Sequence, residues 1–125
     1  MKSIEHAEQV LLMQWWALSH QRFGIPEQLL FAIPNGGLRN IVTAARMKKE
    51  GVRAGIPDLM LAYPTTNYPA LFIEMKRTDG GRLSDSQKTM IKILEYYHYK
   101  CVVCHGWEQA RAEIESYIKE NRQPE

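Results

Sequence analysis

The chain has 125 residues, of which 45% are hydrophobic and 24% are charged. These proportions are ordinary for a globular protein and argue against intrinsic disorder except at the chain ends, so we expect one domain over residues 1–125. The net charge of +2 is too small by itself to indicate a nucleic-acid partner. No apolar run approaches the roughly 20 residues of a membrane span, and residues 1–6 are polar. We therefore expect a cytoplasmic protein with no membrane partner.

The first half of the chain predicts a helix, a strand and a second helix. Apolar residues recur at three- and four-residue steps over residues 3–22, as on one face of a helix. The apolar run at residues 29–33 predicts a strand, and the proline, asparagine and two glycines at residues 34–37 predict a turn. Residues 40–50 form the second predicted helix, with Gly51 as its C-terminal cap.

The second half predicts a hairpin followed by a helix, a strand and a helix. The hairpin joins strands at residues 59–63 and 70–76 across a proline-bounded turn. Ser84 begins the next helix, which runs to about residue 98, and Gln87 three residues on completes a capping box. Residues 101–104 form a strand and residues 107–120 a helix. This order predicts an α/β fold, a mixed β-sheet flanked by helices.

Two acids and a lysine gather on the predicted hairpin. Because side chains alternate along a strand, Glu74 and Lys76 emerge on one face and Met75 points the other way, into the core. Asp58 opens the preceding strand, so its carboxylate can converge on that of Glu74. Two facing carboxylates suit Mg²⁺ or Mn²⁺, which neutralises charge on a phosphate and lowers the pKa of water. Lys76 could then orient or activate that water, which makes the set suitable for phosphodiester hydrolysis.

The pattern Glu-x-Lys has a plainer interpretation. On a strand it is commonly an ion pair on a solvent-exposed face, and such pairs contribute little to the free energy of unfolding. Phe72 shares the face of Glu74 and Lys76, which argues against a solvent-exposed face. The spacing alone leaves both interpretations open.

Basic residues are concentrated between residues 39 and 53, where a single acid, Glu50, accompanies them. A basic face on a near-neutral protein suits a polyanion such as DNA, although the charge alone favours the plainer interpretation of a solvated helix surface. The residues that would contact DNA phosphates are Arg39, Arg46, Lys48, Lys49 and Arg53. The run Asn35-Gly36-Gly37 fits both a backbone nest for a phosphate and an ordinary tight turn.

The run Cys101-Val102-Val103-Cys104-His105 matches the pattern of covalent haem attachment. Its β-branched residues favour a strand, in which positions three apart face opposite ways. The sequence also shows no export signal toward a haem-attachment compartment. We therefore predict neither haem nor a redox pair at these cysteines.

Several of these motifs, taken in order and spacing, resemble the VRR-NUC (virus-type replication-repair nuclease) family, a branch of the PD-(D/E)xK nucleases. The resemblance covers nearly the whole chain. The motifs that carry it are EHAEQ at residues 5–9, AIPNGG at 32–37, AARMKKEGV at 44–52, GIPDL at 55–59, FIEMK at 72–76 and LSDSQ at 83–87.

The resemblance implies a restriction-endonuclease-like fold and a metal-dependent active site. It implies that Asp58, Glu74 and the main-chain carbonyl of Met75 bind Mg²⁺ or Mn²⁺, and that Lys76 is catalytic. A glutamate of the first helix joins the site in this family.

Glu5 fits the spacing of that glutamate, and Glu8 is the second choice. Gln87 matches a family position beside the catalytic lysine, a role compatible with its predicted cap.

Stand-alone viral and bacterial members look like homodimers that act on branched DNA, such as four-way junctions. A compact chain of this kind resembles those members, and the format looks like that of a phage protein. The resemblance thus implies a DNA endonuclease of replication, repair or recombination. The alternative is a non-catalytic DNA-binding or structural subunit with the same fold, against which the intact acid, acid and lysine set argues.

Overall fold

A computed structural model describes residues 2–35 and 41–120, with the side chains of residues 2–4 left out. Within these ranges a mixed sheet is flanked by helices, as the sequence predicts. The elements in chain order are α1 (Lys2–Ser19), the 3₁₀ turns η1 (His20–Phe23) and η2 (Glu27–Leu29), β1 (Leu30–Ala32), α2 (Ile41–Lys49), β2 (Leu59–Leu61), β3 (Leu71–Lys76), α3 (Asp85–Tyr96), β4 (Lys100–His105) and α4 (Trp107–Glu120).

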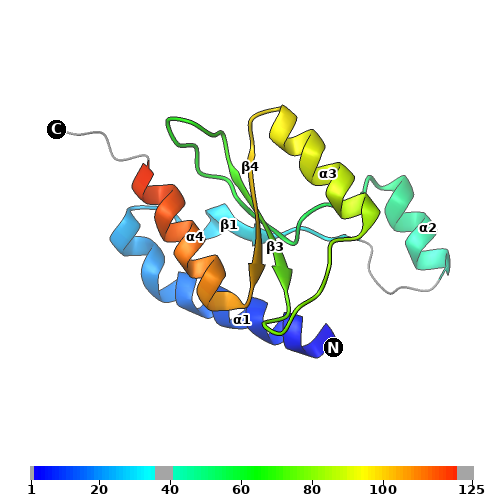
Figure 1. The fold of residues 1–125 in the computed structure, drawn as a ribbon, viewed down its shortest axis with the longest axis horizontal. Helices are drawn as coiled ribbons and strands as arrows, with labels where there is room; N and C mark the ends of the chain where they lie inside the picture. Colours follow the sequence, from blue (N-terminus) through cyan, green and yellow to red (C-terminus); the bar gives the residue numbers. More distant parts are fainter. Residues whose placement is uncertain (1, 36–40, 121–125) are drawn as a thin grey trace.

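The strands lie in the order β1-β2-β3-β4. The predicted hairpin is confirmed, because β2 and β3 pair antiparallel with Leu59 opposite Ile73. β4 runs parallel to β3, and α3 makes the crossover between them that a parallel pair requires (Figure 1).

The two faces of the sheet are covered differently. One face packs against α1 and α4, which lie together in Figure 1, and forms the apolar core. Met75 belongs to this core with only 2% of its surface exposed, which confirms its predicted inward orientation. The opposite face carries Glu74 and Lys76 and meets α3, none of whose own residues is fully buried.

The ends of two helices differ slightly from prediction. α1 ends at Ser19 and continues as the turn η1, which Gly24 closes with φ +71°. α3 ends at Tyr96, two residues early, because His98 takes φ +74° as the chain turns into β4. A left-handed backbone conformation cannot continue a right-handed helix.

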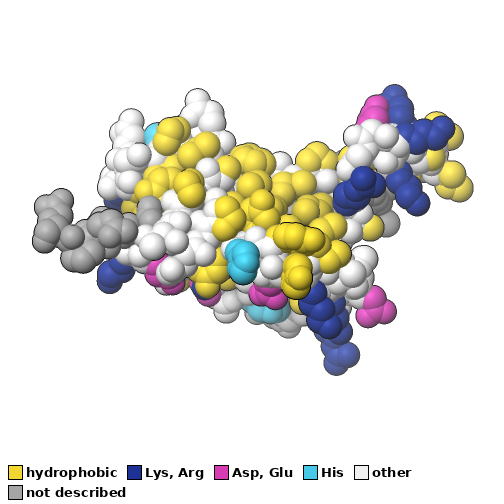
Figure 2. Space-filling model, turned by 90° about the horizontal axis from the view of Figure 1, so that it is seen from above, with side chains coloured by type: hydrophobic (Ala, Val, Ile, Leu, Met, Phe, Trp, Pro, Cys, Tyr) yellow, Lys and Arg dark blue, Asp and Glu magenta, His cyan; other side chains and the backbone are white. Residues whose placement is uncertain are grey.

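The face of the molecule seen from above carries an apolar region and a basic end (Figure 2). Seen from above in Figure 2, apolar side chains crowd the middle of the face, and lysines and arginines gather at the end formed by α2. Ile93 and Tyr96 of α3 and Tyr97, which follows the helix, are 49%, 76% and 64% exposed. Among the described helices, none combines the length and the apolar character needed to cross a membrane.

Gly55 lies where the segment leading to Asp58 passes the start of α3. Its φ is +83°, and a Cβ placed there would overlap the backbone carbonyl of Ser86. Glycine therefore permits both the turn and the close approach. Gly51 also has a positive φ, of +101°, but a Cβ there would meet nothing within 4 Å.

We expect Gly55→Ala to destabilise the protein more than Gly51→Ala. Both variants strain a backbone with positive φ, at roughly 1–2 kcal/mol. Only Gly55→Ala also forces the backbone away from α3, which should bring its loss to about 3 kcal/mol or more. Urea unfolding followed by circular dichroism measures both. Equal losses would contradict a tight contact between this segment and α3.

Candidate active site

Asp58 lies directly before β2 and is held by two hydrogen bonds. Its Oδ2 accepts the backbone N–H of Met75 at 2.7 Å, and its Oδ1 accepts the side-chain amide of Asn35 at 3.4 Å. Backbone pairing of β2 with β3 begins at Leu59. Beyond this point the Asp58 carboxylate takes the place of a backbone carbonyl and accepts the N–H of Met75 on β3. The carboxylate is thereby fixed beside Glu74 and Met75.

Glu74 and Lys76 are buried, with 3% and 8% of their surfaces exposed. The Lys76 Nζ lies 3.5 Å from the Glu74 Oε2. The burial of both side chains excludes the alternative of an ion pair on a solvent-exposed face. Burying such charges costs several kcal/mol per ion unless partners compensate for the lost hydration. Buried ionisable groups of this kind are often found at functional sites.

Gln87 connects both residues to the start of α3. Its Oε1 accepts a hydrogen bond from the Lys76 ammonium, at an N–O distance of 3.2 Å, and another from the backbone N–H of Ser84, at 2.9 Å. Its Nε2 donates to the Glu74 Oε2 at 2.9 Å. The backbone N–H of Ser84 can donate only to the oxygen of the Gln87 side chain. This bond therefore fixes which end of the Gln87 amide is the oxygen and which is the nitrogen. The predicted capping box is confirmed, and the same side chain also contacts Lys76.

The two carboxyl groups strongly perturb each other. Burial, followed by the charge of Asp58, raises the pKa of Glu74 to about 8. Burial also raises the pKa of Asp58, although the Met75 N–H and a hydrogen bond with Glu74 act in the opposite direction. The pair therefore resists full ionisation near neutral pH, because burial and mutual repulsion disfavour two adjacent negative charges.

These donors fit a hard divalent cation. A cation between the two carboxylates would remove the repulsion that raises the pKa of Glu74. The N–H of Met75 points to Asp58. The N–H and the carbonyl of a strand residue point to the same neighbouring strand, so the Met75 carbonyl also faces Asp58. Within the described residues, no three histidine, cysteine or acidic side chains form one ligand cluster.

Two glutamates of α1 were candidates to complete the site. The charge of Glu5 acts on Asp58 and contributes to raising its pKa. The Glu8 Oε1 instead accepts the backbone N–H of Trp107 at 2.7 Å, at the start of α4. The structure thus gives Glu8 a helix-capping contact and leaves Glu5 the better placed to join Asp58.

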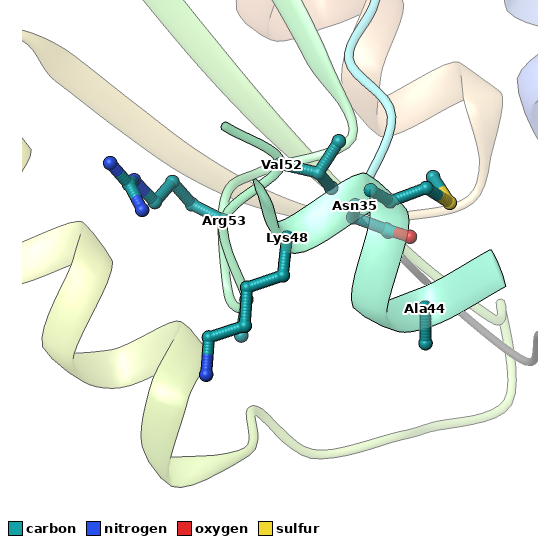
Figure 3. Close-up of a pocket in the computed structure, with 7 residues that line it drawn as sticks. Asn35, Ala44, Lys48, Val52 and Arg53 are labelled. Atoms are coloured by element: carbon teal, nitrogen blue, oxygen red, sulfur yellow. The ribbon is translucent and has the colours of Figure 1, made fainter. Parts of the chain in front are cut away.

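The predicted DNA-binding residues are partly described. Arg46, Lys48 and Lys49 occupy the last turn of α2, and Arg53 follows shortly after it. All four are exposed. Figure 3 shows Lys48 and Arg53 beside a pocket that Asn35 also lines. Gly36, Gly37 and Arg39 lie outside the described residues.

Sequence reasoning missed the contact between Asn35 and Asp58. It left Asn35 open between a phosphate-binding nest and an ordinary tight turn, whereas the side-chain amide also donates to the Asp58 carboxylate. The motif around Asn35 indicated a special residue, but no periodicity could pair positions 23 apart.

The two cysteines lie on β4, as predicted. Cys104 is buried in the core and Cys101 is only partly buried. Burial raises the pKa of each thiol to about 12, so both remain protonated near neutral pH.

Comparisons with known proteins identify the family and the fold. A family model described as the VRR-NUC domain matches residues 2–108. A solved structure titled "VRR_NUC domain protein" superposes with a TM-score of 0.80 and 28% sequence identity, over 94% of this chain and 90% of the other. No curated protein matches the chain.

We expect Glu74→Gln to remove part of the pH dependence of stability in metal-free protein. Because folding raises the pKa of Glu74, the protonated acid favours folding below about pH 4.5, and this contribution is lost as pH rises toward 8. Between pH 5 and pH 8 the wild type should therefore lose about 1–3 kcal/mol more stability than the variant. Denaturant unfolding at several pH values measures this difference.

The exposed Glu95→Gln of α3 provides the matched control. It should follow the wild-type pH profile. Parallel profiles for wild type and Glu74→Gln would show that burial does not perturb the Glu74 carboxyl group.

Proposed function

The chain belongs to the VRR-NUC domain family, and we propose that it is a divalent-metal-dependent endonuclease that hydrolyses phosphodiester bonds of DNA. The family is a nuclease family, and the fold of this chain is of that type. The observation that carries the proposal is the pair of buried charged residues Glu74 and Lys76, with the partly buried Asp58 beside them, at the end of a hairpin. Such a cluster is costly for stability and useful for chemistry on a phosphate.

Asp58, Glu74 and the carbonyl of Met75 would hold Mg²⁺ or Mn²⁺, with Glu5 as a further ligand. When bound, such an ion neutralises charge on the phosphate and lowers the pKa of a water molecule. Two acidic ligands and a carbonyl match the oxygen ligands that both ions prefer.

Lys76 is the chain's own catalytic cation in this proposal. Its ammonium would donate to the attacking water or to a phosphate oxygen and so stabilise the negative charge that develops during attack. Gln87 acts as a positioning residue, because its oxygen holds the ammonium at 3.2 Å while its nitrogen holds Glu74. The capping role of Gln87 keeps this arrangement in place before substrate arrives.

DNA would approach along the basic end of the molecule. We propose that phosphates of the substrate contact Asn35, Gly36, Gly37, Arg39, Arg46, Lys48, Lys49 and Arg53. The exposed last turn of α2 supports this assignment, because its cations are available to a polyanion. We further propose branched DNA, such as a four-way junction, as the preferred substrate in replication, repair or recombination.

A homodimer completes the proposal. Exposed aromatic side chains on α3 support an interface, since large apolar patches on soluble proteins often mark contacts with a partner. The wild type should then sediment as two copies, and the double variant Tyr96→Glu/Tyr97→Glu as one. A wild type that sediments as a single copy at micromolar concentration would contradict the dimer.

We expect Mg²⁺- or Mn²⁺-dependent cleavage of DNA that depends on Lys76 and Asp58. Lys76→Ala removes the ammonium and Asp58→Asn removes a ligand charge, so each should lower the cleavage rate by about 100-fold or more. A panel of duplex, flap, splayed-arm and four-way-junction DNA, with each ion and with chelator, measures the effect.

Lys119→Ala is the matched control, because this exposed lysine lies on α4, which contributes none of the proposed site residues. It should cleave as the wild type does. Binding of Mn²⁺, followed by electron paramagnetic resonance, should weaken in Asp58→Asn. Wild-type protein that binds DNA but cuts no member of the panel would favour a non-catalytic subunit.

A further inference from the structure

A pocket of about 250 Å³ opens beside the candidate active site. Ala44 and Met47 of α2 line it together with Val52, which gives it apolar walls. Lys48 and Arg53 stand at its margin, and in Figure 3 both side chains extend to the same side, away from Ala44. An apolar cavity edged by two cations is suited to a ligand with a flat apolar part and an anionic part.

The pocket adjoins the site that would cut DNA. A second hollow of about 270 Å³ is lined by Gly55, Ile56 and Gln87, and the two hollows share Asn35 and Ala54. Asn35 in turn donates to the Asp58 carboxylate at 3.4 Å. A groove thus leads from the residues around Asp58 and Gln87 to the apolar pocket.

The two cations at the margin are available to a ligand. Among the described residues, neither Lys48 nor Arg53 forms an ion pair, whereas Arg46 on the same helix lies 3.9 Å from Glu50. Two uncompensated cations at the mouth of an apolar cavity favour a phosphate-bearing ligand there.

We propose that this pocket binds the base of an unpaired nucleotide adjacent to the phosphate that is cleaved, while Lys48 and Arg53 contact the phosphates flanking that nucleotide. The proposal rests on the nuclease function proposed above and adds its substrate class. A base in a duplex is stacked between its neighbours, so it must leave the helical stack to enter a side pocket of the protein. DNA with an unpaired nucleotide meets this requirement at the least cost.

The proposal is tested by DNA binding rather than by cleavage. Three fluorescent duplexes are compared in Ca²⁺ by anisotropy: one with a single extrahelical thymidine, one with an abasic residue at that position, and one fully paired. The wild type should bind the thymidine duplex about tenfold more tightly than the abasic duplex, a preference typical of one well-bound base.

The matched variants are Ala44→Leu, which fills the pocket, and Ala45→Leu, which places the same side chain on the exposed neighbouring position of α2. Ala44→Leu should reduce the thymidine preference to about one, and Ala45→Leu should retain it. Circular dichroism checks that both variants fold. The wild-type comparison of thymidine with abasic DNA needs no variant and keeps the proposal falsifiable if Ala44→Leu does not fold.

Failure of this inference and failure of the proposed function are distinguishable. Equal affinity for thymidine and abasic duplexes would overturn the base pocket, and would do so even if the enzyme cleaves DNA; the cavity would then serve phosphates alone. A preference for thymidine in a protein that cuts nothing would support the pocket and overturn the nuclease function.

Discussion

The structure depends on the burial of a carboxyl group and an ammonium, those of Glu74 and Lys76, beside the partly buried carboxyl group of Asp58 at the end of one hairpin. Desolvation opposes this burial, and the mutual repulsion of Asp58 and Glu74 adds to it, which is why the pKa of Glu74 rises to about 8. The chain compensates with oriented donors: the Met75 N–H for Asp58, and the Gln87 amide for Glu74. These bonds fix the positions of the acids without removing their repulsion, so a cation between them would complete the site.

That compensation is tied to the way α3 begins. One oxygen of Gln87 accepts both the Ser84 N–H and the Lys76 ammonium, so the helix cap and the active-site geometry cannot change independently. Gly55 brings the segment before Asp58 into contact with the same turn of α3, at Ser86. The start of α3 is therefore held by polar contacts, and those contacts belong to the candidate site.

The sequence predicted the features that arise from local rules. Strand alternation placed Glu74 and Lys76 on one face and Met75 in the core, and the spacing of Ser84 and Gln87 predicted the cap. Contacts between distant segments could not be predicted in this way. The bond from Asn35 to Asp58 joins residues 23 apart, and the one from Trp107 to Glu8 joins residues 99 apart. Both depend on how the elements pack, which periodicity does not encode.

The helices differ in how firmly core packing holds them. α1 and α4 fill one face with apolar side chains, so polar groups are excluded there. α2 buries no residue, and its first residue Ile41 is 87% exposed. Core packing therefore does little to hold this helix, and its stability rests instead on the cations of its last turn near the helix C-terminus and on the Gly51 turn. A helix held in this way keeps its surface free, and phosphates bound at Lys48 would strengthen its attachment to the groove that leads to Asp58.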